Sequence, residues 1–310
     1  MATTWTREPT QVEVVRRFVT DEFAIALGLS PQGWARRLLD PILRVPGDRF
    51  AQLATELETR LTDSGFSAAL HWLQSQYVSD IAIQGAEHIP RQGPLLVAAN
   101  HPGGYDGLAI LANLGRDDSK IVISDVPLTR VLPQMAQHMI FVSSGPQGRM
   151  SAARATIRHL QSGGAILIFP SGIVDPDPDL QSGAEQGLAD WSPSLELFLR
   201  RIPETQLVVS VVSSVLSQSA LNNPLVRLVQ PAWRRRKLAT FLQISQQLVL
   251  ARELPLSMRL RFGQPVTAAG LLDGGQEEDL GAAIIEHARL VLAQHTAMPQ
   301  ATATTVHPSS

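Results

Sequence analysis

A histidine and an aspartate with four residues between them form the stretch of this chain with the clearest capacity for chemistry. The stretch, Asn100-His101-Pro102-Gly103-Gly104-Tyr105-Asp106, follows an apolar run over residues 94–99. A neutral imidazole can take a proton from a hydroxyl, and a nearby carboxylate can fix its tautomer and stabilise the imidazolium that forms. A structural turn with a locally bonded histidine would contain the same residues, so the spacing alone leaves both interpretations open.

A second junction between an apolar run and a turn occurs at Phe169-Pro170-Ser171-Gly172, after residues 165–168. Ligands of open α/β sheets bind outside the carboxyl ends of the strands, so two such junctions can face one pocket. Backbone N–H groups beside Gly172 are candidates for stabilising an oxyanion, because glycine allows a substrate to approach closely. The alternative is a turn that only ends a buried strand.

Four consecutive cations follow a tryptophan in the run Trp233-Arg234-Arg235-Arg236-Lys237, and an amphipathic stretch begins at Leu238. This arrangement is typical of a segment at a membrane interface, where cations meet anionic lipid. The same cations could instead bind the phosphates of coenzyme A or an acidic acyl carrier protein, or form a solvated surface. The formal net charge of -2 gives no general case for nucleic acid, and we expect no such partner.

The elements that would position these residues change in character along the chain. Apolar residues recur at helical spacing in the first part, with a break predicted at Pro46-Gly47 and a new helix capped by Asp48. Short apolar runs then alternate with helical stretches, which is typical of βαβ units. Strands are predicted at residues 81–83, 95–99, 121–124, 139–142, 165–169, 207–212 and 258–262. A helix is predicted at residues 149–161 after a flexible lead-in at 144–148, and a last helix at 277–293.

The predicted fold is therefore α/β: a mainly parallel mixed sheet flanked by helices and preceded by an N-terminal helical bundle. The expected division is a flexible tail at 1–10, a helical cap at 11–79, the α/β domain at 80–295 and a disordered tail at 296–310. The chain has 310 residues with 44% hydrophobic content, which is enough for a substantial core.

Several kinds of site are excluded or disfavoured by composition. The chain has no cysteine, which excludes disulfides, thiolate metal sites and a cysteine nucleophile. It has no Gly-x-Ser-x-Gly elbow, and its histidines show no metal-ligand spacing with carboxylates, so we expect no metal. No apolar run approaches the roughly 20 residues of a membrane span. We expect a cytoplasmic protein that is peripheral on the inner face of the membrane.

The order of these motifs resembles the glycerol-phosphate and lysophospholipid acyltransferases, over roughly residues 81–292. Their first motif is a histidine, four residues and an aspartate, as at His101 and Asp106, and their third is Phe-Pro-Glu-Gly after an apolar strand, as at Phe169-Pro170-Ser171-Gly172. Residues 207–211 resemble the apolar run of the fourth motif, and residues 261–266 the closing strand and turn.

The resemblance implies an O-acyltransferase that moves a fatty acyl group from a thioester to a hydroxyl of a glycerol-phosphate, lysophospholipid or related lipid. His101 would be the general base and Asp106 would orient it. The implied substrate-binding residues are Asn100, Gly103, Gly104, Arg149, Phe169, Pro170, Ser171 and Gly172. The implied partners are the lipid acceptor and the acyl donor, which is acyl-CoA or acyl carrier protein as co-substrate, with no further cofactor.

The chain departs from the family pattern where the acceptor is held. Ser171 replaces the glutamate of the third motif, Ser210 replaces the proline of the fourth, and Ser143-Ser144 stand where a cation is expected. Arg149 is a candidate replacement, unless it is only a solvated surface residue. These departures suggest an unusual acceptor, and leave two alternatives: a catalytically silent relative that binds lipid or acyl chains, and a hydrolase of acyl thioesters.

Overall fold

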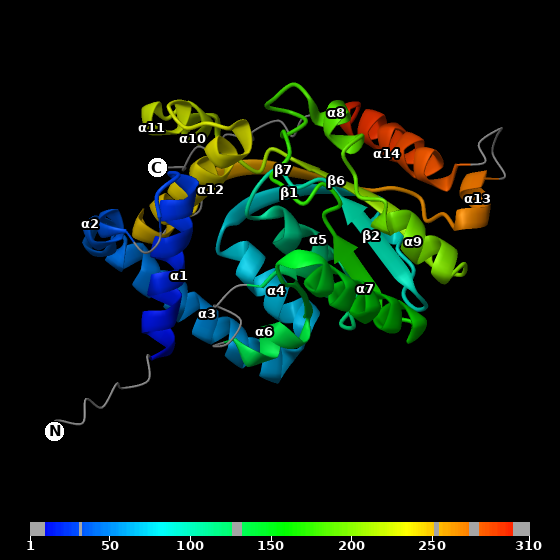
Figure 1. The fold of residues 1–310 in the computed structure, drawn as a ribbon, viewed down its shortest axis with the longest axis horizontal. Helices are drawn as coiled ribbons and strands as arrows, with labels where there is room; N and C mark the ends of the chain where they lie inside the picture. The colour runs from blue at the N-terminus through cyan, green and yellow to red at the C-terminus, as the bar shows by residue number, and fades with distance from the viewer. Residues whose placement is uncertain (1–9, 31–32, 126–131, 251–253, 273–278, 300–310) are drawn as a thin grey trace, which may run out of the picture.

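A seven-stranded sheet forms the centre of the computed structural model, which describes residues 10–30, 33–125, 132–250, 254–272 and 279–299 (Figure 1). The strand order is β1-β7-β6-β2-β5-β3-β4, and every paired neighbour is parallel except β6 and β7. This confirms the predicted α/β fold with a mainly parallel sheet. The strands are β1 (Val78–Gln84), β2 (Leu95–Ala99), β3 (Lys120–Ser124), β4 (Met139–Val142), β5 (Ala165–Ile168), β6 (Gln206–Ser213) and β7 (Leu254–Phe262).

Strand β2 is central and is completely buried, because helices cover both faces of the sheet. Side chains alternate across a strand, and those of β2 divide accordingly between two hydrophobic clusters. Leu95, Val97 and Ala99 belong to the cluster under α4 and α5, whereas Leu96 and Ala98 belong to the cluster under α9 and α14. This burial fixes the strand from which the His101 segment emerges.

Four helices precede the sheet: α1 (Gln11–Ala26), α2 (Trp34–Ile42), α3 (Arg44–Ser64) and α4 (Phe66–Ser75). The predicted break at Pro46-Gly47 is wrong, because α3 begins at Arg44 and runs through both residues. Proline is tolerated in a first helical turn, where its missing N–H would have no partner within the helix. Gly47 is buried against α1, where an added Cβ would lie 3.0 Å from Cγ of Arg16.

Helices lie on both sides of the sheet. Helices α1, α2, α3 and α12 gather on the side opposite α8, α9, α13 and α14 (Figure 1). The helices after α4 are α5 (Asp106–Leu114), α6 (Pro133–Gln137), α7 (Gly145–Gln161), α8 (Ala184–Leu188), α9 (Ser194–Arg201), α10 (Gln218–Leu221), α11 (Pro224–Arg227), α12 (Ala232–Leu250), α13 (Ala268–Leu272) and α14 (Leu280–Thr296), with a short 3₁₀ turn η1 (Ala86–His88).

Two predicted boundaries differ from the structure near helix ends. The flexible lead-in predicted at 144–148 is wrong, because Gly145 already begins α7 and Pro146 occupies its first turn. At the other end of the chain, Met298 is buried within the segment predicted as a tail, and its carbonyl accepts a hydrogen bond from Arg259 at 2.7 Å. Residues 1–9 and 300–310 lie outside the described residues. No helix in the described ranges is both long and apolar enough to cross a membrane.

Candidate active site

The end of β2 and the start of α5 bring His101 and Asp106 together. Nδ1 of His101 lies 2.8 Å from Oδ2 of Asp106, and the two side chains are 30% and 2% exposed, respectively. Asp106 is the first residue of α5, where the helix dipole favours a carboxylate. Because Nδ1 is engaged by the buried carboxylate, Nε2 is the ring nitrogen left to exchange a proton with a bound molecule.

The two glycines between these residues let the loop lie close to neighbouring segments. The amide of Gly103 donates to Oδ2 of Asp106 at 2.9 Å, and that of Gly107 donates to Oδ1 at 2.6 Å. Gly104 lies against α12, where an added Cβ would come within 2.7 Å of Cγ2 of Thr240. The loop therefore packs closely on α12 while its backbone holds the carboxylate in place.

The electrostatic surroundings favour a charged His101. Burial is the largest influence and lowers the pKa of the imidazole, but the charge and hydrogen bond of Asp106 raise it, as does the charge of Asp175, while that of Lys237 lowers it. The net result is a pKa of His101 above its usual value. A side chain with this balance can both accept and return a proton near neutral pH.

Phe169 and the turn after β5 lie against the same histidine. The Phe169 ring stacks on the His101 ring with centroids 4.5 Å apart, followed by the buried Pro170 and the exposed Gly172. The amide of Gly172 donates to the Phe169 carbonyl at 3.1 Å, and that of Ile173 faces Oγ of Ser171 at 3.4 Å. The turn therefore uses the amides of Gly172 and Ile173 itself, and an oxyanion role for the backbone beside Gly172 stays a prediction.

Asp175 is the residue of this cluster that sequence reasoning missed. It is buried, its Oδ2 accepts the His101 amide at 2.8 Å, and its own amide donates to the His101 carbonyl at 2.7 Å. The same Oδ2 lies 3.0 Å from Oγ of Ser171. The available signal was the sequence Asp175-Pro176-Asp177-Pro178-Asp179, whose acidic residues follow the second turn directly.

Asn100 lies beside the pair, but its side chain is hydrogen-bonded to the backbone of the neighbouring strand β6. Its Nδ2 donates to the Val212 carbonyl at 2.9 Å, and its Oδ1 accepts the Val212 amide at 2.8 Å. These bonds extend the pairing of β2 and β6 by one residue. They also fix the end of β2. The side-chain amide of Asn100 therefore faces β6 and not the space that a substrate would enter.

The basic run at the start of α12 is half-buried and turns partly toward the site. Arg234 lies over the Trp233 ring, and Lys237 pairs with Glu22 of α1 at 2.6 Å. Nε of Arg236 donates to the Val174 carbonyl at 2.8 Å, next to Asp175. Two of the four cations predicted to meet a membrane or carrier therefore lie close to His101.

Arg149 is not brought to this cluster. It is exposed on α7, which connects the edge strand β4 to β5, and no contact in the described part of the chain joins it to the His101 loop. The cation that bonds to the segment beside Asp175 is Arg236, which is supplied by α12 instead.

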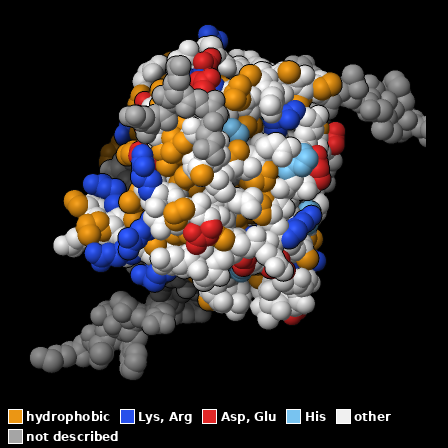
Figure 2. Space-filling model, turned by 90° about the vertical axis from the view of Figure 1, so that its right-hand side faces the viewer, with side chains coloured by type: hydrophobic (Ala, Val, Ile, Leu, Met, Phe, Trp, Pro, Cys, Tyr) orange, Lys and Arg blue, Asp and Glu red, His pale blue; other side chains and the backbone are white. Residues whose placement is uncertain are grey.

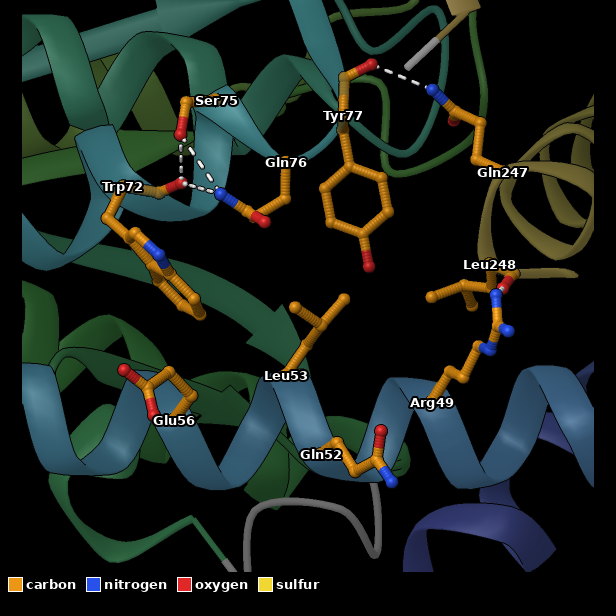
Figure 3. A pocket seen from close by; sticks show the side chains of 10 residues that line it. All are labelled: Arg49, Gln52, Leu53, Glu56, Trp72, Ser75, Gln76, Tyr77, Gln247 and Leu248. Carbon is orange, nitrogen blue, oxygen red and sulfur yellow. Dashed lines mark hydrogen bonds between the residues drawn. The ribbon is translucent and has the colours of Figure 1, made fainter. Parts of the chain in front are cut away.

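A cleft of about 940 Å³ opens between α3, α4 and the end of α12 (Figure 3). Its lining is mixed, with Trp72, Leu53 and Leu248 among polar side chains. Gln247 forms part of the wall: its Nε2 donates to the Tyr77 carbonyl at 2.7 Å, and its Oε1 accepts the Tyr105 hydroxyl. Neither His101 nor Asp106 lines this cleft, and Tyr105, the residue before Asp106, meets its wall through the bond with Gln247.

The sheet of this α/β protein carries a histidine–aspartate pair at its carboxyl edge, an arrangement that can accept and return a proton. A family model described as Acyltransferase matches residues 80–237, just over half of the 310 residues, and the chain belongs to this family. It is therefore an acyltransferase, as the order of its motifs predicts. Within the described ranges, no group of three His, Asp or Glu side chains is arranged to hold a metal ion.

No curated protein matches the chain. The crystal structure of the 1-acyl-sn-glycerophosphate (LPA) acyltransferase PlsC from Thermotoga maritima is similar at a TM-score of 0.44 and 17% identity, over 93% of this chain and 97% of that one.

Proposed function

We propose that this acyltransferase moves a fatty acyl group from an acyl thioester to a hydroxyl of a glycerol-phosphate, lysophospholipid or related lipid. The observation that carries the proposal is the 2.8 Å contact between Nδ1 of His101 and the buried Asp106 carboxylate. With the ring proton held on Nδ1, Nε2 is available as a general base. The His101 side chain is 30% exposed, so part of the imidazole is open to an incoming molecule.

The reaction proceeds by direct attack. Nε2 of His101 takes the proton of the acceptor hydroxyl, and the oxygen forms a bond to the thioester carbonyl carbon. The carbon–sulfur bond then breaks, and the leaving thiolate takes the proton back from the imidazolium. Asp106 stabilises the imidazolium between these two steps. No acyl-enzyme is needed, in keeping with a chain that has no cysteine.

Arg236 is the cation that we propose for an anionic group of the acceptor, in place of Arg149. It is half-buried, and it makes no ion pair within the described part of the chain. A partly desolvated guanidinium binds phosphate strongly, through charge-assisted hydrogen bonds. The contact of Arg236 with the carbonyl before Asp175 puts this charge beside the His101 loop.

Peripheral contact with a membrane is a further part of the proposal, since the acceptor is a lipid. Helix α2 carries a row of exposed apolar side chains four residues apart, Trp34, Leu38 and Ile42, at 76%, 60% and 70% exposure. Exposed Arg37 and Arg44 flank them. Hydrophobic and basic side chains also lie together at the left edge of the face in Figure 2. Apolar side chains among cations suit an anionic lipid surface.

The test is purified protein incubated with labelled acyl-CoA or acyl carrier protein and a panel of lysolipids and glycerol phosphate. We expect an acylated acceptor with wild type and loss of turnover with His101→Ala, since general-base catalysis typically contributes about 10²- to 10⁴-fold. Equal rates for the two proteins would refute the role of His101. Free fatty acid formed without acceptor would identify a thioester hydrolase, and binding without turnover would identify a silent relative.

A further inference from the structure

The backbone of His101 is tied on both sides by one residue. The His101 amide donates to Oδ2 of Asp175 at 2.8 Å, and the Asp175 amide donates to the His101 carbonyl at 2.7 Å. Asp175 is only 4% exposed, so water competes little for these bonds. Asp106 holds the imidazole through Nδ1, whereas Asp175 holds the peptide groups from which that imidazole projects.

The same carboxylate contacts the residue at which the chain departs from its family pattern. Oγ of Ser171 lies 3.0 Å from Oδ2 of Asp175. Position 171, where the family pattern has a glutamate, therefore carries a short hydroxyl side chain in contact with a carboxylate from four residues further along the chain.

We propose that Asp175 is a positioning residue for His101, and that it supplies from the following loop the carboxylate that is absent at Ser171. This inference rests on the proposed role of His101 as general base. The hydrogen bonds on both sides of His101 and the contact with Ser171 carry it. Arg236, which binds the Val174 carbonyl at 2.8 Å, secures the same loop from α12.

A positioning role has two separable consequences, geometric and electrostatic. The charged groups that face His101 are Asp106 from α5, Asp175 from the loop after β5 and Lys237 from α12, which is paired with Glu22 of α1. The charge of Asp175 raises the pKa of His101. Asp175→Asn keeps an oxygen that accepts from the His101 amide but removes the charge, whereas Asp175→Ala removes both.

The experiment measures kcat, KM and the pH dependence of kcat/KM for both variants. Asp175→Ala should lower kcat by about 10- to 100-fold with little change in donor KM, because a misplaced base loses near-attack geometry. Asp175→Asn should keep kcat within about tenfold of wild type and move the acid limb of kcat/KM to lower pH, since loss of a nearby negative charge lowers the pKa of His101.

Asp177→Asn is the matched control for loss of stability. Asp177 is also buried, but its carboxylate accepts the amides of Ser214 and Val215, both at 3.1 Å, and none from His101. This variant should unfold at a lower temperature without moving the acid limb. If Asp175→Asn only lowers the melting temperature and leaves the acid limb in place, Asp175 is merely structural and the inference is wrong.

A third variant separates this inference from the proposed function. If His101→Ala retains wild-type turnover, the role of His101 itself fails, whatever the Asp175 variants do. If His101→Ala is inactive while both Asp175 variants match wild type in kcat and pH dependence, only the positioning role fails.

Discussion

Oδ2 of Asp106 binds two groups at once, Nδ1 of His101 at 2.8 Å and the amide of Gly103 at 2.9 Å. The amide contact keeps the buried carboxylate from rotating away from the imidazole. The ring therefore has a fixed tautomer before any substrate arrives. Such preorganisation lowers the cost of forming the imidazolium during the reaction.

Asp106→Asn should lower kcat by about 10²- to 10⁴-fold, because an amide neither stabilises the imidazolium nor enforces the tautomer. The charge and hydrogen bond of Asp106 raise the pKa of His101, so their loss should move the acid limb of kcat/KM to lower pH. Activity across pH 5 to 9 gives both quantities. Asp118→Asn, which changes a carboxylate paired with Arg116, should leave both unchanged. An Asp106→Asn enzyme of normal kcat contradicts the role of the pair.

The sequence could predict the elements whose signals are local. Strand β2 is an uninterrupted apolar run ended by Asn-His-Pro-Gly-Gly, and its predicted bounds of 95–99 coincide with those observed. His101 and Asp106 are joined by a turn short enough for their spacing alone to bring them together. The family model confirms the class of enzyme that the order of the motifs predicts.

Contacts between distant segments could not be predicted in the same way. Asp175 meets His101 across 74 positions, and Arg236 meets Val174 across 62. Such contacts depend on how β5 and α12 pack, which no local pattern of residues specifies. Arg149 follows Ser143-Ser144 closely along the chain, whereas Arg236 reaches the loop of Asp175 from a helix that is distant in sequence.

Gly104→Ala should destabilise the protein by about 1–3 kcal/mol and lower activity, because the new methyl group overpacks the contact with α12. Its Cβ would lie 2.7 Å from Cγ2 of Thr240 and 3.0 Å from Cδ1 of Ile244. Urea unfolding and initial rates measure the two effects. Gly270→Ala in α13, where the nearest atom would be 3.6 Å away, is the control and should be neutral or slightly stabilising. A Gly104→Ala protein as stable as wild type would show that the loop can move from α12.

Arg236→Ala should raise the KM for a phosphate-bearing acceptor by about 10- to 100-fold, the usual loss when a hydrogen bond to a charged group is removed. An acceptor without phosphate, such as a monoacylglycerol, should show little change in KM, although kcat should fall for both acceptors because Arg236 also holds the loop that carries Asp175. Arg149→Ala, at the exposed position on α7, should leave both KM values unchanged. An equal rise for both acceptors would exclude a phosphate contact by Arg236. In that case, weaker sedimentation of Arg236→Ala than of wild type with anionic vesicles would show that the basic run acts at the membrane instead.

His295 should make stability depend on pH. It is fully buried, its Nε2 lies 2.7 Å from Oγ of Ser213, and burial first and then the charge of Arg259 lower its pKa to about 4. An unfolded histidine binds its proton near pH 6.5, so the stabilisation is complete above that pH and is lost as pH falls toward 4. The loss should reach about 2 kcal/mol at pH 5.

Asp177 acts in the opposite direction, because burial raises its pKa to about 6, and the wild-type protein alone would partly conceal the effect. The measurement is therefore the difference in unfolding free energy between wild type and His295→Gln, by urea unfolding at pH 7 and pH 5. This difference should shrink at pH 5, since only wild type carries the histidine that resists protonation. His71→Gln, at an exposed position on α4, is the matched control for the histidine-to-glutamine substitution itself. A difference that is equal at both pH values would mean that His295 titrates normally in the folded protein.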